Sequence, residues 1–358
     1  MLSNRYISNT MSEDLLRLYA DLESDLIVAY SSKISKESFT AVWLRNRALA
    51  VRELRHDLEK IVNKYNPKIV KEIEKTLKET GYKALESDER FYRKAVEKGV
   101  LKDIGDVVDS KALESILKQS VKEVVGEFKA MNTTAILTTA SRNKINRAMN
   151  NILSGAFTRE QGIRKSVIDL TEKGITGVVF ESGKTMGLVE YARMSISTGC
   201  MTCTRDLVNE RMSEYDIDLV AVSSHAGARP KCYPYQGEIY SWSGKSDKYP
   251  AISSTSYGEP DGLFGINCRH YYTPYVEEMG KYIEDEVREK ENAKIYDLSQ
   301  EQRYNERQIR KYKREAEGLK SAGLDNSRAK AKVSEWQARQ REFIEKNDLT
   351  RIYAREKV

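Results

Sequence analysis

Residues 224–240 read SHAGARPKCYPYQGEIY, and residues 262–272 read GLFGINCRHYY. These two stretches hold two of the three histidines of the chain and two of its four cysteines. Five of the six prolines lie between Pro230 and Pro274. Because proline breaks helices and central strands, we expect this region to consist of loops and short strands.

The flanking sequence has helical periodicity. Ile69, Ile73 and Leu77 recur every four residues, and the same spacing continues in the next helical stretch. The apolar positions of that stretch are Leu113, Leu117, Val121, Val124 and Phe128. Each such helix has one apolar face to bury, so we expect an antiparallel helical bundle over roughly residues 10–150.

The central part of the chain alternates between helix and strand. Thr158 and Gln161 have the spacing of a capping box that opens a helix to about residue 173, where Gly174 ends it. A second helix is expected over residues 188–215. β-branched, apolar runs predict short strands at ITGVVF (175–180), IDLVAVS (217–223) and GEIYSWS (237–243). Further helices are expected over residues 277–318 and from about 327 to 346.

These patterns predict a predominantly helical α+β fold in three successive parts. The parts are a helical bundle (1–150), a small loop-rich α+β module (151–276) and a basic helical tail (277–358). The 40% hydrophobic and 32% charged residues suit a protein with long exposed helices. No stretch approaches the roughly 18–20 apolar residues of a membrane span, so none is expected. Four cysteines are too few for a disulfide scaffold and fit a reducing cytosol.

The cysteines and histidines leave several readings open. Thiolate and imidazole are the ligands that Zn²⁺ prefers. The candidate zinc ligands are His225, Cys232, Cys268 and His270. Cys200 and Cys203 would complete a four-cysteine alternative, although their positions fit a helix rather than a zinc knuckle. A cysteine nucleophile paired with histidine is a further alternative, but no protease signature surrounds either cysteine.

A structural role explains more of the residues. Glycines supply turn conformations, and Arg229 and Arg269 carry rigid forks that suit loop carbonyls or a carboxylate. Gln236 and Asn267 can bind backbone groups that irregular loops leave without ladder partners. We therefore expect no catalytic residue and no cofactor, with the cysteines and histidines locking the loops together; zinc remains the alternative.

The combined pattern resembles the phage minor capsid protein 2 family, relatives of the Mu F-like head morphogenesis proteins. It comprises Val222–Pro230, Gln236-Gly237, Gly262-Leu263, Gly265 and Asn267–His270, with Ser154–Phe157, Gln161, Gly174–Thr176, Ser182-Gly183 and Arg193 upstream. We interpret the following motif positions as structural: His225, Gly227, Arg229, Pro230, Cys232, Gln236, Gly237, Gly265, Asn267, Cys268, Arg269 and His270.

The resemblance implies a non-enzymatic minor component of a tailed phage or prophage. Such a protein would be made in the bacterial cytoplasm and packaged inside the head near the portal. Its partners would be portal, capsid or scaffold proteins, and it would assist head morphogenesis and DNA packaging or delivery. The alternative is a zinc-dependent or Cys/His enzyme, such as a maturation protease or nuclease, centred on the four motif cysteines and histidines.

Positive charge concentrates near the C-terminal part of the sequence. Residues 303–341 hold twelve Lys/Arg against five Asp/Glu, whereas the whole chain has a net charge of +6. The candidate phosphate-binding residues are Arg303, Arg307, Arg310, Lys311, Lys313 and Arg314. Their helical spacing suggests a face that binds double-stranded DNA non-specifically and with strong salt dependence. The alternative is a solvated helix that pairs with an acidic protein partner.

Overall fold

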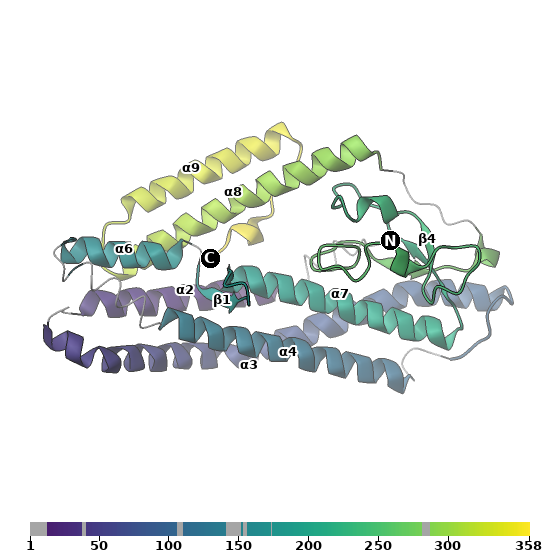
Figure 1. Ribbon diagram of the computed structural model, residues 1–358, viewed down its shortest axis with the longest axis horizontal. Helices are drawn as coiled ribbons and strands as arrows, with labels where there is room; N and C mark the ends of the chain where they lie inside the picture. Colours follow the sequence, from purple (N-terminus) through teal and green to yellow (C-terminus); the bar gives the residue numbers. More distant parts are fainter. Residues whose placement is uncertain are drawn as a thin grey trace. The chain divides into compact units, whose positions relative to one another are not determined.

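The computed structural model describes residues 13–37, 41–105, 110–140, 152, 156–172, 174–280 and 287–358. Most of them lie in long helices, and the strands are short (Figure 1), which confirms the predominantly helical α+β fold class. The helices are α2 (Glu13–Lys36), α3 (Ala41–Glu97), α4 (Lys111–Thr139), α6 (Arg159–Thr171), α7 (Leu188–Glu214), α8 (Glu289–Ser321) and α9 (Ser327–Lys346). The strands are β1 (Thr176–Val179), β2 (Thr185–Gly187), β3 (Leu219–Val222), β4 (Ile239–Ser241) and β5 (Tyr272–Pro274).

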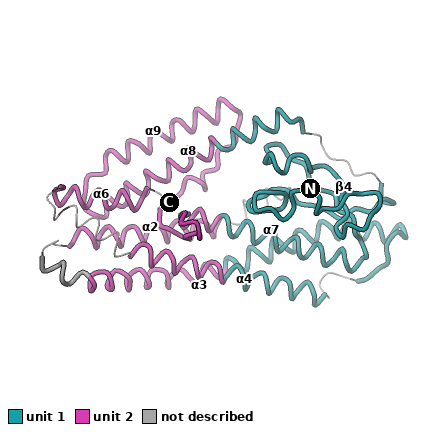
Figure 2. The backbone as a smooth tube through the Cα atoms, viewed as in Figure 1, with its two compact units in different colours: residues 1–12, 72–125, 194–300 teal, residues 13–71, 126–193, 301–358 magenta. Residues whose placement is uncertain are grey.

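The chain forms two compact units, which Figure 2 distinguishes by colour. Among the described residues, unit 1 comprises 72–125 and 194–300, and unit 2 comprises 13–71, 126–193 and 301–358. Each unit therefore combines stretches that are far apart in the sequence. The predicted boundaries at 150/151 and 276/277 do not coincide with these units, and the first of them lies outside the described residues. As a description of folding units, the three-part partition stays a prediction.

A three-stranded antiparallel sheet with β3 in its centre forms the framework of unit 1. Val220 of β3 lies opposite Tyr240 of β4 on one side and Pro274 of β5 on the other. Because β5 is an edge strand, Pro274 removes no hydrogen bond from the interior of the sheet. The sheet packs against Val208 and Met212 of α7, and this core positions the loops that carry the motif.

Unit 2 is mainly helical and also contains the antiparallel pair β1–β2, and polar side chains are buried between its helices. The apolar face of α2 is buried at Leu15, Leu16, Leu22, Leu26, Ile27 and Ile34. Tyr19 of α2 donates a hydrogen bond to Asn132 of α4 at 3.2 Å. Tyr30 of α2 lies 2.6 Å from Ser166 of α6. These bonds satisfy hydroxyl and amide groups that burial would otherwise leave without partners.

Several local predictions are confirmed. Thr158 and Gln161 form both hydrogen bonds of a capping box at the start of α6, and Gly174 follows this helix with a φ of +78°. Strands β1, β3 and β4 lie within the three predicted runs, and α7 occupies the helix expected over residues 188–215. The break at residues 321–327 separates α8 from α9 as predicted.

The predicted start of the C-terminal helices at residue 277 was wrong. Residues Glu277–Met279 form a single 3₁₀ turn, and Gly280 follows with a φ of +109°, a conformation that α-helix does not contain. The α-helix begins only at Glu289, and residues 281–286 lie outside the described residues. The periodicity of the sequence also did not reveal the short strands β2 and β5. No helix in the described part of the chain is both long enough and apolar enough to cross a membrane.

Candidate functional site

The pairing of β3 with β5 brings the two halves of the motif together in unit 1. Val222, at the end of β3, lies opposite Tyr272, at the start of β5. The chain that leaves β3 therefore runs beside the chain that enters β5. Ser223 donates its backbone N–H to the carbonyl of Tyr271, and Tyr271 returns a bond to the Ser223 hydroxyl, at 2.9 and 3.0 Å. Beyond this bridge, the rings of His225 and His270 stack with their centres 4.3 Å apart.

Gln236 joins the two halves by accepting two hydrogen bonds at its amide oxygen Oε1. One donor is the backbone N–H of His225 at 3.2 Å, and the other is Nε2 of His270 at 3.0 Å. Since Oε1 can only accept, Nε2 of His270 carries the ring proton. The other ring nitrogen, Nδ1, therefore presents a lone pair, and it faces the Sγ atom of Cys268 at 3.4 Å.

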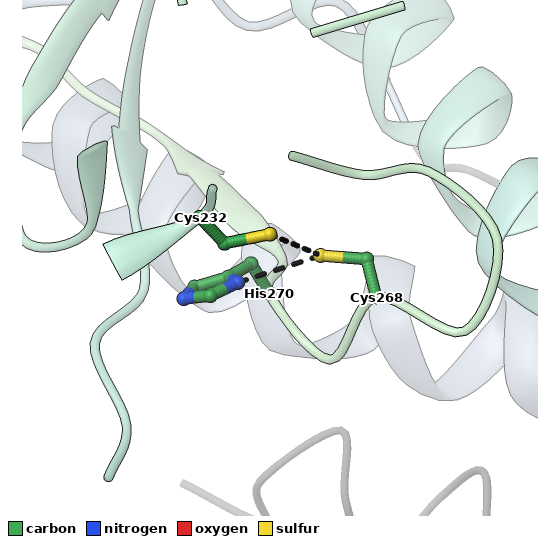
Figure 3. Close-up of side chains that lie close together, drawn as sticks. All are labelled: Cys232, Cys268 and His270. Carbon is green, nitrogen blue, oxygen red and sulfur yellow. Dashed lines mark hydrogen bonds between the residues drawn. The ribbon is translucent and has the colours of Figure 1, made fainter. Parts of the chain in front are cut away.

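Cys232, Cys268 and His270 converge on one buried point (Figure 3). The two Sγ atoms are 4.0 Å apart, and the ligand atoms of all three residues lie within 4.8 Å of one another. The exposed fractions of the residues are 1%, 6% and 1%. The hydrogen bond with the Cys232 thiol and the contact with His270 lower the pKa of Cys268, and burial opposes this effect. The same bond, together with burial, raises the pKa of Cys232.

His225 stands beside this cluster without joining it. Its Nδ1 atom lies 3.2 Å from the carbonyl of Ala226, so Nδ1 donates and Nε2 keeps a lone pair. That Nε2 atom is buried and has no hydrogen-bond partner among the described residues. Burial lowers the pKa of His225 to about 4, and the neighbouring His270 and Arg269 add to this effect. The ring is therefore neutral at physiological pH.

The arginines of the motif hold loop carbonyls, one of the two roles predicted for them. Arg229 donates to the carbonyl of Ile266, and Arg269 donates to the carbonyl of Gly227. Each arginine thus ties its own half of the motif to the other half. Asn267 occupies the left-handed region with a φ of +57°, which asparagine tolerates better than most residues.

Gly265 and Pro230 shape the loops in which these contacts lie. A Cβ atom on Gly265 would lie 2.5 Å from the carbonyl oxygen of Glu259 and 2.7 Å from that of Pro260, so only glycine fits there. Pro230 follows Arg229, whose carbonyl accepts the backbone N–H of Cys232 at 2.9 Å. This turn delivers Cys232 into the core of unit 1, among apolar side chains.

Asn292 is a residue of this site that the sequence analysis missed. It lies in the first turn of α8 and is 4% exposed. Its Oδ1 atom accepts the backbone N–H of Ala228 at 2.7 Å, and its Nδ2 atom donates to the carbonyl of Ala228 at 2.9 Å. These two hydrogen bonds satisfy backbone groups of the loop between His225 and Pro230, which has no partner at Ala228 among the described strands. Asn292 lies outside the motif, and nothing in the local sequence marks it.

Cys200 and Cys203 do not contribute to the cluster. Both are buried on α7, as the helical spacing predicted, and Cys200 accepts a hydrogen bond from Thr80 of α3 at 3.8 Å. Burial raises the pKa of both thiols. The structure therefore does not assemble the four-cysteine alternative.

A cavity of about 20 Å³ adjoins the cluster. Cys268 and His270 line one side of it, and Met201, Thr204, Arg205, Val208, Phe264, Tyr271 and Tyr272 line the rest. This volume holds about one water molecule or ion. Pockets that bind organic ligands are larger by an order of magnitude, at about 300–1,000 Å³.

Two of the candidate DNA-binding arginines are buried within unit 2. Arg310 donates to Glu190 of α7 at 2.8 Å, and Arg314 lies 3.3 Å from Glu23 of α2. Arg314 also donates to the carbonyl of Thr171. Although burial alone raises the pKa of Glu190, the two guanidinium groups hold it below its ordinary value. These arginines stabilise the interior and do not form an exposed phosphate-binding face.

The remaining four candidates are more accessible, and two of them contact groups of unit 2. Lys311 lies 3.4 Å from Glu172, and Lys313 donates to the carbonyl of Glu356. Arg303 is half-buried, whereas Arg307 is exposed. These four residues lie on α8, and further exposed cations lie on α9: Arg328, Lys330, Arg339, Arg341 and Lys346.

The upstream part of the motif lies in unit 2. Gln161 belongs to the capping box of α6, and Gly174 precedes Ile175, whose backbone N–H is bound by Glu23 at 2.9 Å. Ser154 and Gly155 lie outside the described residues. Gln161 therefore caps a helix, and Ile175 takes part in a buried backbone hydrogen bond.

Comparison with known proteins gives one family and two phage relatives. The family description "Phage minor capsid protein 2" matches residues 2–345. A "Structural protein" of Lactococcus phage LL-H is 29% identical over 309 residues, which cover 82% of this chain and 83% of that protein. A "Structural protein" of Lactococcus phage mv4 is 39% identical over 114 residues, 31% of this chain and 93% of that protein. No solved structure matches. The match over nearly the whole length shows that the chain belongs to the phage minor capsid protein 2 family.

Proposed function

We propose that this protein is a minor structural component of the virion of a tailed phage or prophage, packaged inside the head close to the portal. There it assists head morphogenesis and the packaging or delivery of DNA. Family membership and the printed names of both relatives support the structural role. Made in the host cytoplasm, the protein would assemble with portal and with capsid or scaffold proteins.

The observation that supports this proposal is that polar side chains of the motif bind the two loops to each other. Arg229, Gln236 and Arg269 form hydrogen bonds with backbone atoms or with another side chain of the motif. None of these bonds leaves a polar group pointing into a substrate-sized cleft. These hydrogen bonds stabilise the conformation of the two motif loops. A fixed surface of this kind suits recognition by an assembly partner.

The same geometry does not favour the alternative of a protease or nuclease. Cys268 and His270 meet only a cavity of about 20 Å³, which has no room for a peptide or a nucleotide. His225 lies beside His270 rather than within hydrogen-bonding reach of a thiol in the described cluster. We therefore propose a non-enzymatic role.

Quantitative mass spectrometry of heads assembled with and without the portal gene tests the portal-proximal location. We expect the protein in heads that contain the portal and a strong depletion from heads that lack it, with the major capsid protein as internal reference. Equal incorporation into both kinds of head would contradict a location at the portal.

We further propose that exposed cations of α9, rather than Arg310 and Arg314, give the protein a non-specific contact with double-stranded DNA. Arg328, Arg339 and Lys346 are exposed, and their spacing places them on one face of α9, which can lie along phosphates. Such binding releases counterions, so its affinity falls steeply as salt rises.

Filter binding or fluorescence anisotropy over a series of salt concentrations tests this contact. Replacing Arg328, Arg339 and Lys346 together by Gln should weaken binding and lower the slope of log affinity against log salt by up to about 3. The matched control replaces Lys68, Lys71 and Lys78, which are exposed on α3, and removes the same charge. Equal losses from both triple variants, or DNA retention that survives high salt, would overturn the proposal.

A further inference from the structure

We propose that Cys232, Cys268 and His270 bind a structural zinc ion in the core of unit 1. Two thiolates and one imidazole form a donor set that Zn²⁺ prefers over harder cations. The three residues come from two separate places in the chain: Cys232 lies in the turn after Pro230, and Cys268 and His270 lie in the segment that leads into β5. An ion bound by all three would join the two halves of the motif at their most buried point.

The distances fit a tetrahedral site. With Zn–S bonds of about 2.3 Å and a Zn–N bond of about 2.0 Å, two sulfur ligands lie about 3.8 Å apart, and a sulfur and a nitrogen about 3.5 Å apart. The two Sγ atoms are 4.0 Å apart, and Cys268 Sγ lies 3.4 Å from His270 Nδ1. These two pairs are within a few tenths of an ångström of the tetrahedral values, and the third pair, Cys232 with His270, lies within 4.8 Å, so it closes by at most about 1.3 Å when an ion binds.

Gln236 prepares His270 to act as a ligand. By accepting the Nε2 proton, its amide oxygen fixes the tautomer in which Nδ1 carries the lone pair that points at the thiols. Metal-binding histidines commonly donate their second ring nitrogen to such a partner, which fixes the ring and increases its basicity. A histidine that only filled space would not need this orientation.

Two further observations point to a ligand at this position. His225 places a second buried ring nitrogen beside the cluster, and its Nε2 lone pair has no partner among the described residues. The adjoining cavity of about 20 Å³ holds one small ligand. A water molecule in this cavity or a rotated His225 ring could each complete four-fold coordination. The near-complete burial of all three ligands fits a structural site, because catalytic zinc sites keep a position open to substrate.

A disulfide between Cys232 and Cys268 is the chemical alternative. The separation of 4.0 Å is about twice the S–S bond length of about 2.05 Å. A disulfide would also leave His270 Nδ1 facing a group that neither donates a proton nor needs the lone pair. Zinc uses all three groups, and binding releases the thiol protons to solvent.

Metal analysis of the full-length protein, purified without chelators or added metal, tests the proposal. We expect about one zinc ion per chain for the wild type. Cys232→Ser, Cys268→Ser and His270→Ala should each abolish this zinc. The matched controls are Cys200→Ser and Cys203→Ser, which also replace buried cysteines of unit 1 but lie outside the cluster. The proposal is overturned if the controls lose zinc as completely as the ligand variants.

Measurements on the wild type keep the test valid if a ligand variant fails to fold. Protein reconstituted with cobalt should show the thiolate-to-cobalt charge-transfer absorption of a site with cysteine ligands. Gln236→Leu, which leaves all ligands in place, should weaken zinc affinity by roughly 10–100-fold. Wild-type protein with four free thiols that takes up neither zinc nor cobalt would refute the site. A Cys232–Cys268 disulfide in freshly purified protein would refute it as well.

Discussion

The guanidinium group of Arg314 on α8 lies 3.3 Å from the carboxylate of Glu23 on α2, and the two side chains are 3% and 0% exposed. Arg314 also binds the carbonyl of Thr171, and Glu23 also binds the backbone N–H of Ile175. One buried ion pair therefore connects three helices and the start of β1 within unit 2. The segment that the sequence marked as a basic tail is, in part, the interior of this unit.

Breaking this pair from one side should destabilise unit 2. Arg314→Met leaves the Glu23 carboxylate buried without its cation, and we expect the free energy of unfolding to fall by about 3 kcal/mol in denaturant titrations. Lys332→Met serves as the control, because the Lys332–Glu335 pair on α9 is exposed and its loss should change stability by less than about 1 kcal/mol. Equal losses of stability in the two variants would show that the buried ion pair contributes no more than the exposed one.

The Glu259–Gly265 loop should tolerate no side chain at Gly265. Gly265→Ala places a Cβ atom 2.5 Å from a carbonyl oxygen, and we expect a loss of about 1–3 kcal/mol by thermal or chemical unfolding. Gly126→Ala on α4 is the matched change, because its Cβ meets nothing within 4 Å and alanine favours helix, so it should stabilise by about 0.5–1 kcal/mol. A neutral Gly265→Ala would mean that the loop is not packed as described.

The hydrogen bonds of Gln236 should contribute to the free energy of unfolding in addition to the packing of its side chain. Gln236→Leu removes the acceptor of both the His225 N–H and the His270 Nε2–H, and we expect a loss of about 1–3 kcal/mol in the free energy of unfolding. Gln119→Leu on α4 changes an exposed glutamine that contacts only Glu123 among the bonds described, and it should have little effect. The idea that Gln236 holds the two halves together fails if both variants unfold like the wild type.

Asp88 should make stability depend on pH. Burial raises the pKa of this carboxyl from the ordinary 3.8 to about 7, and neighbouring Glu89 adds to the shift. Below about pH 4 both folded and unfolded states are protonated; between pH 4 and 7 only the unfolded state loses the proton. Stability from this group is therefore full in acid and falls as pH rises to about 7.

Replacing Asp88 by Asn should remove this dependence. Compared with the wild type, Asp88→Asn should be more stable at pH 8 by on the order of 2–4 kcal/mol and nearly equal at pH 4. Glu79→Gln changes an exposed carboxyl on the same helix and should leave the pH profile unchanged. Parallel profiles for the wild type and Asp88→Asn would show that Asp88 titrates normally.

Local sequence signals predicted the elements better than the contacts between them. The capping box from Thr158 to Gln161 spans only four residues, and its prediction is confirmed. The meeting of Cys232 with Cys268 depends on the pairing of β3 with β5, and β5 is three residues long with a proline at its end. β4 is equally short and was predicted, but the run around β5 contains this proline, which argues against a strand in sequence analysis.

The spacing of the basic residues in the sequence could not show which of them are buried. The spacing of Arg310 and Arg314 places them on one helical face, but the same spacing describes a face toward DNA and a face toward buried carboxylates. Their partners, Glu190 and Glu23, lie 120 and 291 residues away in the sequence. Asn292 has a motif partner 64 residues away and no neighbouring signal.

The location of the protein in the assembled particle is the central claim, and protease protection tests it most directly. Purified, DNA-filled virions and virions opened by chelator or heat are treated with trypsin, and peptides of this chain are quantified against the major capsid protein. We predict that the chain is present in far fewer copies than the major capsid protein, is protected in intact virions and is digested in opened ones. Its absence from purified virions, or its digestion in intact ones, would contradict the account.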